Sequence, residues 1–265
     1  INVGASFTFN KNTLKEQAEA PQLYANTAST GHCYGQAFGY VANGFFQKSD
    51  DLNGDGIISA AEMQQNGYPV QSFTTVYPGD VKYVDITGDN NIDANDRKAI
   101  GYSTTAPDIY YNFHLGAEYK GIGLDAMFQG VGRWTGFMTT NGLYRSAVAT
   151  NTLSQYLYEN SWSAERGNTE SALFPRLSTT SNANNDLNST LNMFDRSYIK
   201  LRYVELSYHL PKSLLNKLSV INNIKLYVRG TDLFTADHLD KADAASYGVA
   251  QPLTRSVQLG AALTF

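Results

Sequence analysis

The chain has 265 residues and a formal net charge of −4; 42% of its residues are hydrophobic and only 17% are charged. This low charge, together with 18 tyrosines and 22 glycines, indicates a β-rich protein that meets lipid or sugar. No basic patch alternates with aromatic residues, which argues against a nucleic-acid partner. The sequence contains no run of about 18 apolar residues, so it predicts no transmembrane helix. The single cysteine, Cys33, excludes an internal disulfide.

Strict alternation of apolar and polar residues, the pattern of β-strands with two different faces, is the strongest signal. It occurs in segments near residues 1–10, 108–118, 121–131, 197–210, 223–234 and 254–265. Strands of about ten residues span roughly 33 Å, the length that a tilted transmembrane strand needs. The apolar residues are odd-numbered up to Leu201 and even-numbered from Val204, which predicts a β-bulge near Arg202–Val204.

The connections between these segments differ in length in a regular way. Residues 11–107, 132–196 and 235–253 form long or medium connections, whereas the intervening turns are short. Short periplasmic turns and long extracellular loops are typical of outer-membrane barrels. The predicted fold is therefore all-β: six or so strands of a large antiparallel transmembrane β-barrel. Six strands cannot close a barrel, since even small barrels need about eight. The alternative is a soluble sandwich with unusually long loops.

A twelve-residue acidic segment in the first long connection has the spacing of a calcium loop. Oxygen-bearing side chains occupy positions 1, 3, 5, 9 and 12, and a backbone carbonyl serves at position 7. The predicted ligands are Asp51, Asn53, Asp55, Ile57, Ser59 and Glu62. Without a cation the carboxylates would repel one another, so we expect calcium to stiffen this connection on the extracellular side.

A second copy of the motif follows, with Asn90 where the first has Gly56. Its predicted ligands are Asp85, Thr87, Asp89, Asn91, Asp93 and Asp96. Asp96 is shorter than glutamate at position 12, which predicts weaker binding. The alternative for both copies is an acidic turn that binds no metal. If calcium is bound, saturated oxygen coordination leaves no open position for a substrate and predicts a structural role.

No catalytic constellation is present, and the sequence predicts a protein that is not an enzyme. The four histidines are scattered and form no metal-binding spacing. Glu118 and Asp125 on predicted strands indicate wall lining rather than general acids. Four aromatic residues of the second long connection could stack on sugar rings, although loop packing or membrane-interface anchoring is the favoured interpretation. They are Tyr144, Tyr156, Tyr158 and Trp162.

Several short motifs, in this order, resemble the SusC-like TonB-dependent transporters of the Bacteroidetes outer membrane. The segment at residues 39–47 reads GYVANGFFQ, similar to the family's GYVADGIFQ, and residues 77–85 read YPGDVKYVD, similar to PGDLKYKD. Residues 199–208 resemble IKLRNVSLGY, residues 226–234 resemble LYVSGQNLF, and the end of the chain, LGAALTF, resembles LGLNLTF. The second acidic loop, rather than the first, lies where the family shows DLNGDGVIDDND.

This resemblance implies a barrel of about 22 strands around a plug, of which this chain is the C-terminal portion. It implies active import of an oligomeric nutrient, a glycan or a peptide, powered by the TonB complex and assisted by a SusD-like surface lipoprotein. The chain opens on Ile1 without an initiator methionine or signal peptide, and we expect the plug and the TonB-binding segment upstream of it.

The terminal strand carries a further expectation. Alternating apolar residues that end in an aromatic resemble the signal read by the barrel assembly machinery. The predicted signal residues are Leu259, Ala261, Leu263 and Phe265. The alternative is that Phe265 only anchors the chain in the membrane interface. Two other functions also remain open at this point: a structural or scaffolding subunit of an outer-membrane assembly, and a soluble calcium-binding module.

Overall fold

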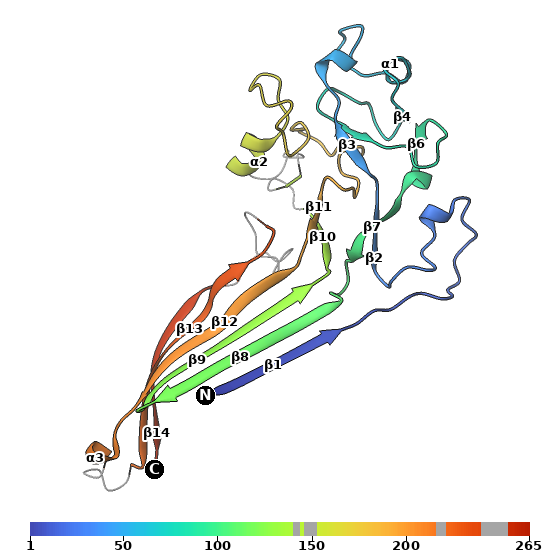
Figure 1. Ribbon diagram of the computed structural model, residues 1–265. Coiled ribbons are helices and arrows are strands. Elements are labelled where there is room, and N and C mark those ends of the chain that lie inside the picture. Colours follow the sequence, from blue (N-terminus) through green and yellow to red (C-terminus); the bar gives the residue numbers. More distant parts are fainter. Residues whose placement is uncertain (140–143, 146–152, 216–220, 240–253) are drawn as a thin grey trace. The chain divides into compact units, whose positions relative to one another are not determined.

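The structure, a computed structural model, describes residues 1–139, 144–145, 153–215, 221–239 and 254–265 (Figure 1). The described chain divides into two compact units. The first, which we call the sheet unit, comprises Ile1–Lys11, Ala106–Trp134 and Asp195–Phe265. The second, which we call the loop unit, comprises Asn12–Thr105 and Thr135–Phe194. Among the described helices, none has the length and apolarity required to cross a bilayer.

The sheet unit is a 6-stranded sheet in the order β1-β8-β9-β12-β13-β14, and every neighbouring pair is antiparallel. Its strands are β1 (Asn2–Phe9), β8 (Ile109–Tyr119), β9 (Ile122–Gly132), β12 (Tyr198–His209), β13 (Asn223–Ala236) and β14 (Ser256–Thr264). These are the alternating segments of the sequence, because a two-residue period places one set of side chains on each face. The predicted all-β class is confirmed.

The register explains where the long connections begin. Phe9 pairs with Ile109, Ile109 with Gly132, and Val131 with Tyr198. These residues lie at the same end of their strands, so the long connections leave and re-enter the sheet at that end. The tight β8–β9 turn lies at the other end of the strands, and in it Lys120 and Gly121 both have positive φ, 50° and 82°. Two positive φ values define the hairpin turn that matches strand twist, and glycine accepts that geometry at little cost.

The predicted bulge is present in β12. The pairing register shifts between Leu201 and Tyr203 on both sides of the strand, toward β9 and toward β13. The extra residue, Arg202, donates a hydrogen bond of 2.8 Å to Asp232, which itself has a positive φ of 52°. After β12, a short helix α3 (Lys212–Leu215) occupies the start of the next turn.

The loop unit is built from short elements. Its strands are β2 (Gln36–Gly39), β3 (Ala42–Phe45), β4 (Val70–Gln71), β5 (Val81–Tyr83), β6 (Asn91–Ile92), β7 (Lys98–Ser103), β10 (Thr135–Phe137) and β11 (Met193–Asp195). Its helices are α1 (Ala60–Gln65), α2 (Gln155–Asn160) and the 3-10 turns η1 (Ala25–Thr27), η2 (Lys48–Asp50) and η3 (Ala94–Asp96). The strands pair two by two, as β2-β7, β3-β5, β4-β6 and β10-β11.

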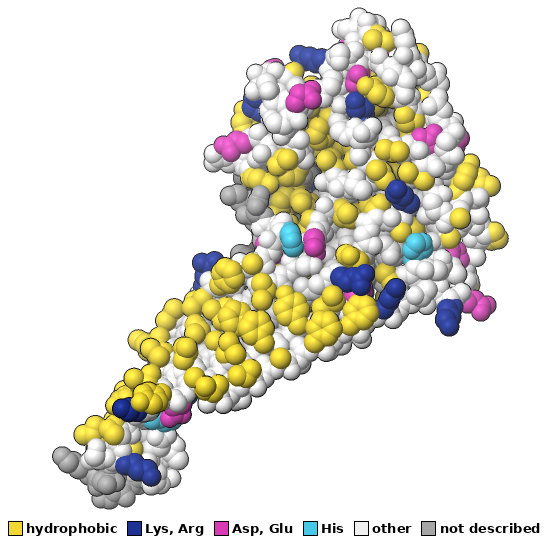
Figure 2. All heavy atoms as spheres, in the orientation of Figure 1, with side chains coloured by type: hydrophobic (Ala, Val, Ile, Leu, Met, Phe, Trp, Pro, Cys, Tyr) yellow, Lys and Arg dark blue, Asp and Glu magenta, His cyan; other side chains and the backbone are white. Residues whose placement is uncertain are grey.

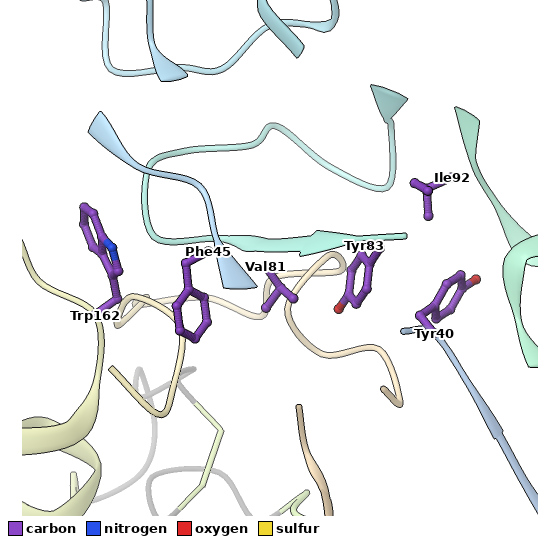
Figure 3. Packing of buried hydrophobic residues seen from close by; sticks show 6 residues of the cluster. All are labelled: Tyr40, Phe45, Val81, Tyr83, Ile92 and Trp162. Carbon is purple, nitrogen blue, oxygen red and sulfur yellow. The ribbon is translucent and has the colours of Figure 1, made fainter. Parts of the chain in front are cut away.

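A hydrophobic core holds the loop unit together (Figure 3). Its buried members come from both long connections: Tyr40, Phe45, Val81, Tyr83, Ile92 and Trp162. A second cluster packs Phe46, Ile58, Met63 and Val76 beside the first acidic loop. The first connection therefore has a packed core of its own, in which burial of aromatic and aliphatic side chains, the dominant favourable term in folding, contributes to its order.

Candidate functional site

One face of the sheet unit is apolar and exposed. Its side chains pair across the strands, as in Val3 with Leu115 and Leu124 with Leu206, and the Phe113 and Phe128 rings stack with centroids 4.5 Å apart. Hydrophobic side chains cover the sheet in Figure 2. Leu206 is 54% exposed and Leu259 is 81% exposed. Soluble monomers rarely expose contiguous apolar patches of this kind, so the face is built to meet lipid or another apolar partner.

The other face of the same strands is polar. Glu205 accepts hydrogen bonds from Lys225 at 2.6 Å and from Arg229 at 2.8 Å, and its side chain is only 5% exposed. His114 lies 2.7 Å from Asp125. A cavity of about 430 Å³ opens on this face, lined by Glu118, Asp125, Glu205 and both cations among others. Glu118 and Asp125 are thus part of a polar wall, as the sequence indicated.

Asp80 is the polar centre of the loop unit. Its carboxylate is fully buried, and it accepts hydrogen bonds from Arg176 Nε at 2.7 Å, from Asn185 at 2.9 Å and from Asn182 at 3.1 Å. The backbone N–H of Tyr77 donates a fourth hydrogen bond, at 3.0 Å. A buried carboxylate is tolerated only when it is paired and hydrogen-bonded. Asp80 therefore ties the first long connection to the second.

The two acidic loops adopt the same hydrogen-bonded turn. In the first, Asp51 accepts from the N–H groups of Gly54 and Gly56, three and five residues on. In the second, Asp85 accepts from Gly88 and Asn90 at the same offsets. Gly56 has a φ of 84° and Asn90 a φ of 65°, so the asparagine adopts the left-handed conformation that its position requires.

Position 12 closes each turn. Glu62 accepts from the N–H groups of Leu52 and Asn53 and from both the N–H and the hydroxyl of Ser59. Asp96 likewise accepts from Ile86, from Thr87 and from Asp93 N–H. Position 9 is the N-cap of the following helical turn in both loops, and position 12 completes a capping box.

These donors stabilise the ionised carboxylates. Hydrogen bonds from the Ser59 backbone and hydroxyl, with smaller contributions from Asn53 and Leu52, lower the pKa of Glu62 to about 2. For Asp85, partial burial raises the pKa, but hydrogen bonds from Asn90, Gly88 and Thr87 outweigh it and leave the pKa below its usual value. Both groups are therefore negatively charged at neutral pH.

The predicted metal ligands lie in two matching turns. Across the described residues, however, no three His, Cys, Asp or Glu side chains gather into a group that could hold a metal ion. The reason is visible at Asp51, Asp85, Glu62 and Asp96, whose oxygens are directed at N–H groups of their own loops. Asn53, Asp55 and Asp89 also accept or donate only within their own turns.

The aromatic residues of the second connection pack rather than present open faces. Tyr144 and Trp162 are buried, and the Tyr156 ring meets Phe174 edge to face at 5.7 Å. Tyr158 is exposed, but the Arg166 guanidinium lies 4.4 Å from its ring centroid. Loop packing, the favoured interpretation of these residues, therefore describes them better than sugar stacking.

The predicted assembly signal is the edge strand β14. Leu259, Ala261 and Leu263 pair with Val228, Leu226 and Ile224 of β13, on its apolar face. Phe265 follows the last strand residue and is 72% exposed.

Sequence reasoning missed two polar clusters. The pairing of Glu205 with Arg229 could have been found, because the two residues are directly opposite in the β12–β13 register. The Asp80 cluster had no comparable signal, since its partners lie about a hundred positions away in an irregular segment.

The sequence and the structure were compared with those of known proteins. No family model matches the chain. It is 25% identical over 251 residues to TonB-dependent receptor P3 of Formosa agariphila, a match that covers 90% of this chain and 22% of that protein. A structure of the RagAB peptide transporter superposes with a TM-score of 0.68 at 18% identity, covering 99% of this chain and 26% of the other. The RagAB peptide importer in its open-open state gives a TM-score of 0.66 at 20% identity, with 99% and 26% covered.

The fold is thus that of the corresponding part of the RagAB transporter structures. The sequence resemblance to the TonB-dependent receptors is confirmed over nearly the full chain. The chain spans about a fifth of the curated relative and about a quarter of the solved transporters. These proteins are named as a receptor and as peptide transporters rather than enzymes, in agreement with the expectation from the sequence.

Proposed function

We propose that this chain forms part of the wall and the outer loops of an integral outer-membrane importer of oligomeric nutrients. The observation that carries the proposal is the two-faced sheet: apolar side chains stand exposed on one face, and a charged, hydrogen-bonded cavity lies on the other. A transmembrane barrel wall needs this division, because one face meets lipid and the other a polar lumen. The similarity to a TonB-dependent receptor supports the same assignment.

The import would depend on three partners that the sequence resemblance implies. A SusD-like lipoprotein would close over the loop unit, the TonB complex would supply energy through other parts of the protein, and the barrel assembly machinery would insert it. For the nutrient we favour a peptide over a glycan. The solved relatives are named peptide transporters, and the described aromatic residues of the second connection are packed or covered.

Uptake by living cells tests the proposal. Deleting the gene should abolish accumulation of fluorescent oligopeptides, and restoring the complete gene should recover it. A version with its TonB-binding segment disabled should reach the membrane normally yet fail to import. If that version imports normally, or if deletion changes only the assembly of other surface proteins, the chain belongs to a scaffold instead of an importer.

We also propose that the two acidic loops bind calcium on the extracellular side. Their ligand spacing and their matching turns support this role. In the first loop, four donors already occupy the Glu62 carboxylate, and a carboxylate has about four acceptor sites. The ion would have to displace some of these donors, so we expect weak affinity, on the order of 10⁻⁴–10⁻³ M, as in other extracellular modules.

Calorimetric titration of the detergent-solubilised protein with Ca²⁺ measures this directly. Glu62→Gln keeps a capping side chain but removes a charged ligand, and it should weaken the first site about tenfold or more. Glu16→Gln, an equal charge change at an exposed residue of the same unit, is the control. An absence of calcium-dependent heat up to about 10 mM would mean that the loops are closed turns stabilised by their own hydrogen bonds.

A further inference from the structure

The loop unit contains a pocket that the transport assignment leaves without a role. Its volume is about 290 Å³, and both long connections line it. Lys48 comes from η2 in the first connection, and Trp162, Glu165, Arg166 and Arg176 come from the second. Small-molecule sites usually measure about 300–1,000 Å³. The pocket therefore fits one residue or one functional group of an oligomer.

The charge of the pocket is opposite to that of the chain. Three cations and one carboxylate line it, whereas the chain as a whole carries −4. Asp80 neutralises Arg176, which leaves Lys48 and Arg166 against Glu165. Among the described residues, Lys48 makes no side-chain hydrogen bond or ion pair, and Arg166 has no carboxylate partner. The pocket thus keeps an excess of positive charge available to a ligand.

The two guanidinium groups are held in fixed orientations. Arg166 lies over the Tyr158 ring at 4.4 Å and donates hydrogen bonds to Ser161 O at 2.9 Å and Oγ at 2.8 Å. Arg176 lies over the Tyr77 ring at 4.5 Å while it holds Asp80. Guanidinium groups that are stacked and hydrogen-bonded lose little further freedom on binding an anion, which favours recognition of a carboxylate.

The same stacking removes the surface that a sugar would use. Arginine covers the Tyr158 and Tyr77 rings. Trp162 is only 7% exposed, because its ring lies close against Gly79, where an added Cβ would fall 2.4 Å from the indole. Among the pocket's described surroundings, no aromatic ring offers an open platform, so these residues recognise charge rather than a ring face.

We infer that this pocket is a subsite for an acidic side chain, aspartate or glutamate, of a peptide substrate. The inference rests on the proposed function and deepens it by naming the substrate class. Lys48 and Arg166 supply the attraction. Arg176 and Asp80 position the walls, and the pocket's volume admits a single side chain with its adjoining backbone.

The test uses the complete importer, purified in detergent, and two fluorescent decapeptides that differ only in carrying glutamate or glutamine at alternate positions. Lys48→Gln should lower the affinity for the glutamate peptide about three- to fivefold, the range of a partly exposed ion pair, and leave the glutamine peptide unchanged. Lys48→Arg should restore the preference. Lys15→Gln, an exposed lysine of the same unit outside the pocket, is the matched control.

Other outcomes distinguish a failure of the subsite from a failure of the proposed import function. If both peptides bind and Lys48→Gln affects neither or both equally, the subsite is overturned and peptide import stands. If no peptide binds but oligogalacturonate does, and Lys48→Gln weakens it, the pocket recognises an acidic glycan and the peptide assignment is wrong. If neither probe binds the complete importer, the proposed function and the subsite are both overturned.

Discussion

In each unit a single buried carboxylate binds several polar or charged side chains, and in the sheet unit this residue is Glu205. Its carboxylate is nearly inaccessible, and Lys225 Nζ and a terminal guanidinium nitrogen of Arg229, Nη2, both lie 2.6 Å from it. Removing one member of such a group leaves charges without compensation, which costs more than the group contributes as a whole. Because both cations are partly exposed, water recovers some of that loss.

Glu205→Gln should therefore destabilise the barrel by about 1–3 kcal/mol, a value typical of a lost charged hydrogen bond. The thermal midpoint of the barrel in detergent, followed by gel mobility with and without heating, measures the effect. Glu118→Gln removes the same charge from the same face at an exposed residue and should shift the midpoint far less. Equal shifts in the two variants would show that only the overall charge of the wall matters.

Asp80 performs the corresponding task in the loop unit. In Asp80→Asn the amide oxygen can still accept from Arg176, Asn182 and Asn185, but the new NH2 group would face the N–H of Tyr77, and Arg176 would lose its charged partner. We expect a loss of about 3–5 kcal/mol, as for other broken buried pairs. Faster backbone hydrogen exchange in β5 with unchanged exchange in β9 would confirm it. Unchanged exchange in β5 would mean that the hydrophobic core alone holds the connections together.

At the scale of elements, the sequence predicted the strands well and the loop unit poorly. The two-residue alternation located β8, β9 and β13, and the change of phase at Leu201 located the bulge, because strand faces are encoded locally. The loop unit follows no period. Its buried cluster contains both Phe45 and Trp162, which are more than a hundred positions apart, and such a cluster leaves no local pattern in the sequence.

In the acidic loops, too, the sequence indicates the local backbone turn but not the orientation of the side chains. The spacing from Asp51 to Glu62 predicted a calcium loop, with an acidic turn as the alternative, and the segment forms a turn closed by its own hydrogen bonds. Whether its oxygens face a cation or N–H groups depends on rotamers, which the spacing of ligands does not determine. The apolar face of β14 could also be predicted from the two-residue alternation of its own sequence. In the structure these apolar residues lie opposite those of β13.

The edge strand β14 leads to a prediction about assembly. Deleting Phe265 should lower the amount of barrel in the outer membrane several-fold, because the exposed terminal aromatic would no longer be offered to the insertion machinery. Immunoblots of membrane fractions measure this amount. Phe265→Trp separates recognition from anchoring, since tryptophan also anchors at the membrane interface. Full membrane levels of the deletion variant with poor peptide uptake would count against an assembly role.

At the scale of the molecule, the sheet has an open strand on each side. Within the described residues β1 pairs only with β8, and β14 only with β13, so each outer strand has one edge without a partner strand. An unpaired edge presents free N–H and C=O groups that recruit other strands, and in lipid such groups cannot be left unsatisfied. In the barrel wall that we propose, these edges would therefore need further partner strands, and the chain covers about a quarter of the solved transporter.

This chain produced alone should consequently fail to form a closed barrel. Refolded into detergent micelles, residues 1–265 should give large oligomers by light scattering and no heat-modifiable monomer, because the β1 and β14 edges would pair between copies. Supplying the remainder of the protein as a second polypeptide should shift the material toward a one-to-one complex, since the missing strands would then satisfy both edges. A stable, heat-modifiable monomer of the isolated chain would show that its strands close on themselves and that no larger barrel is required.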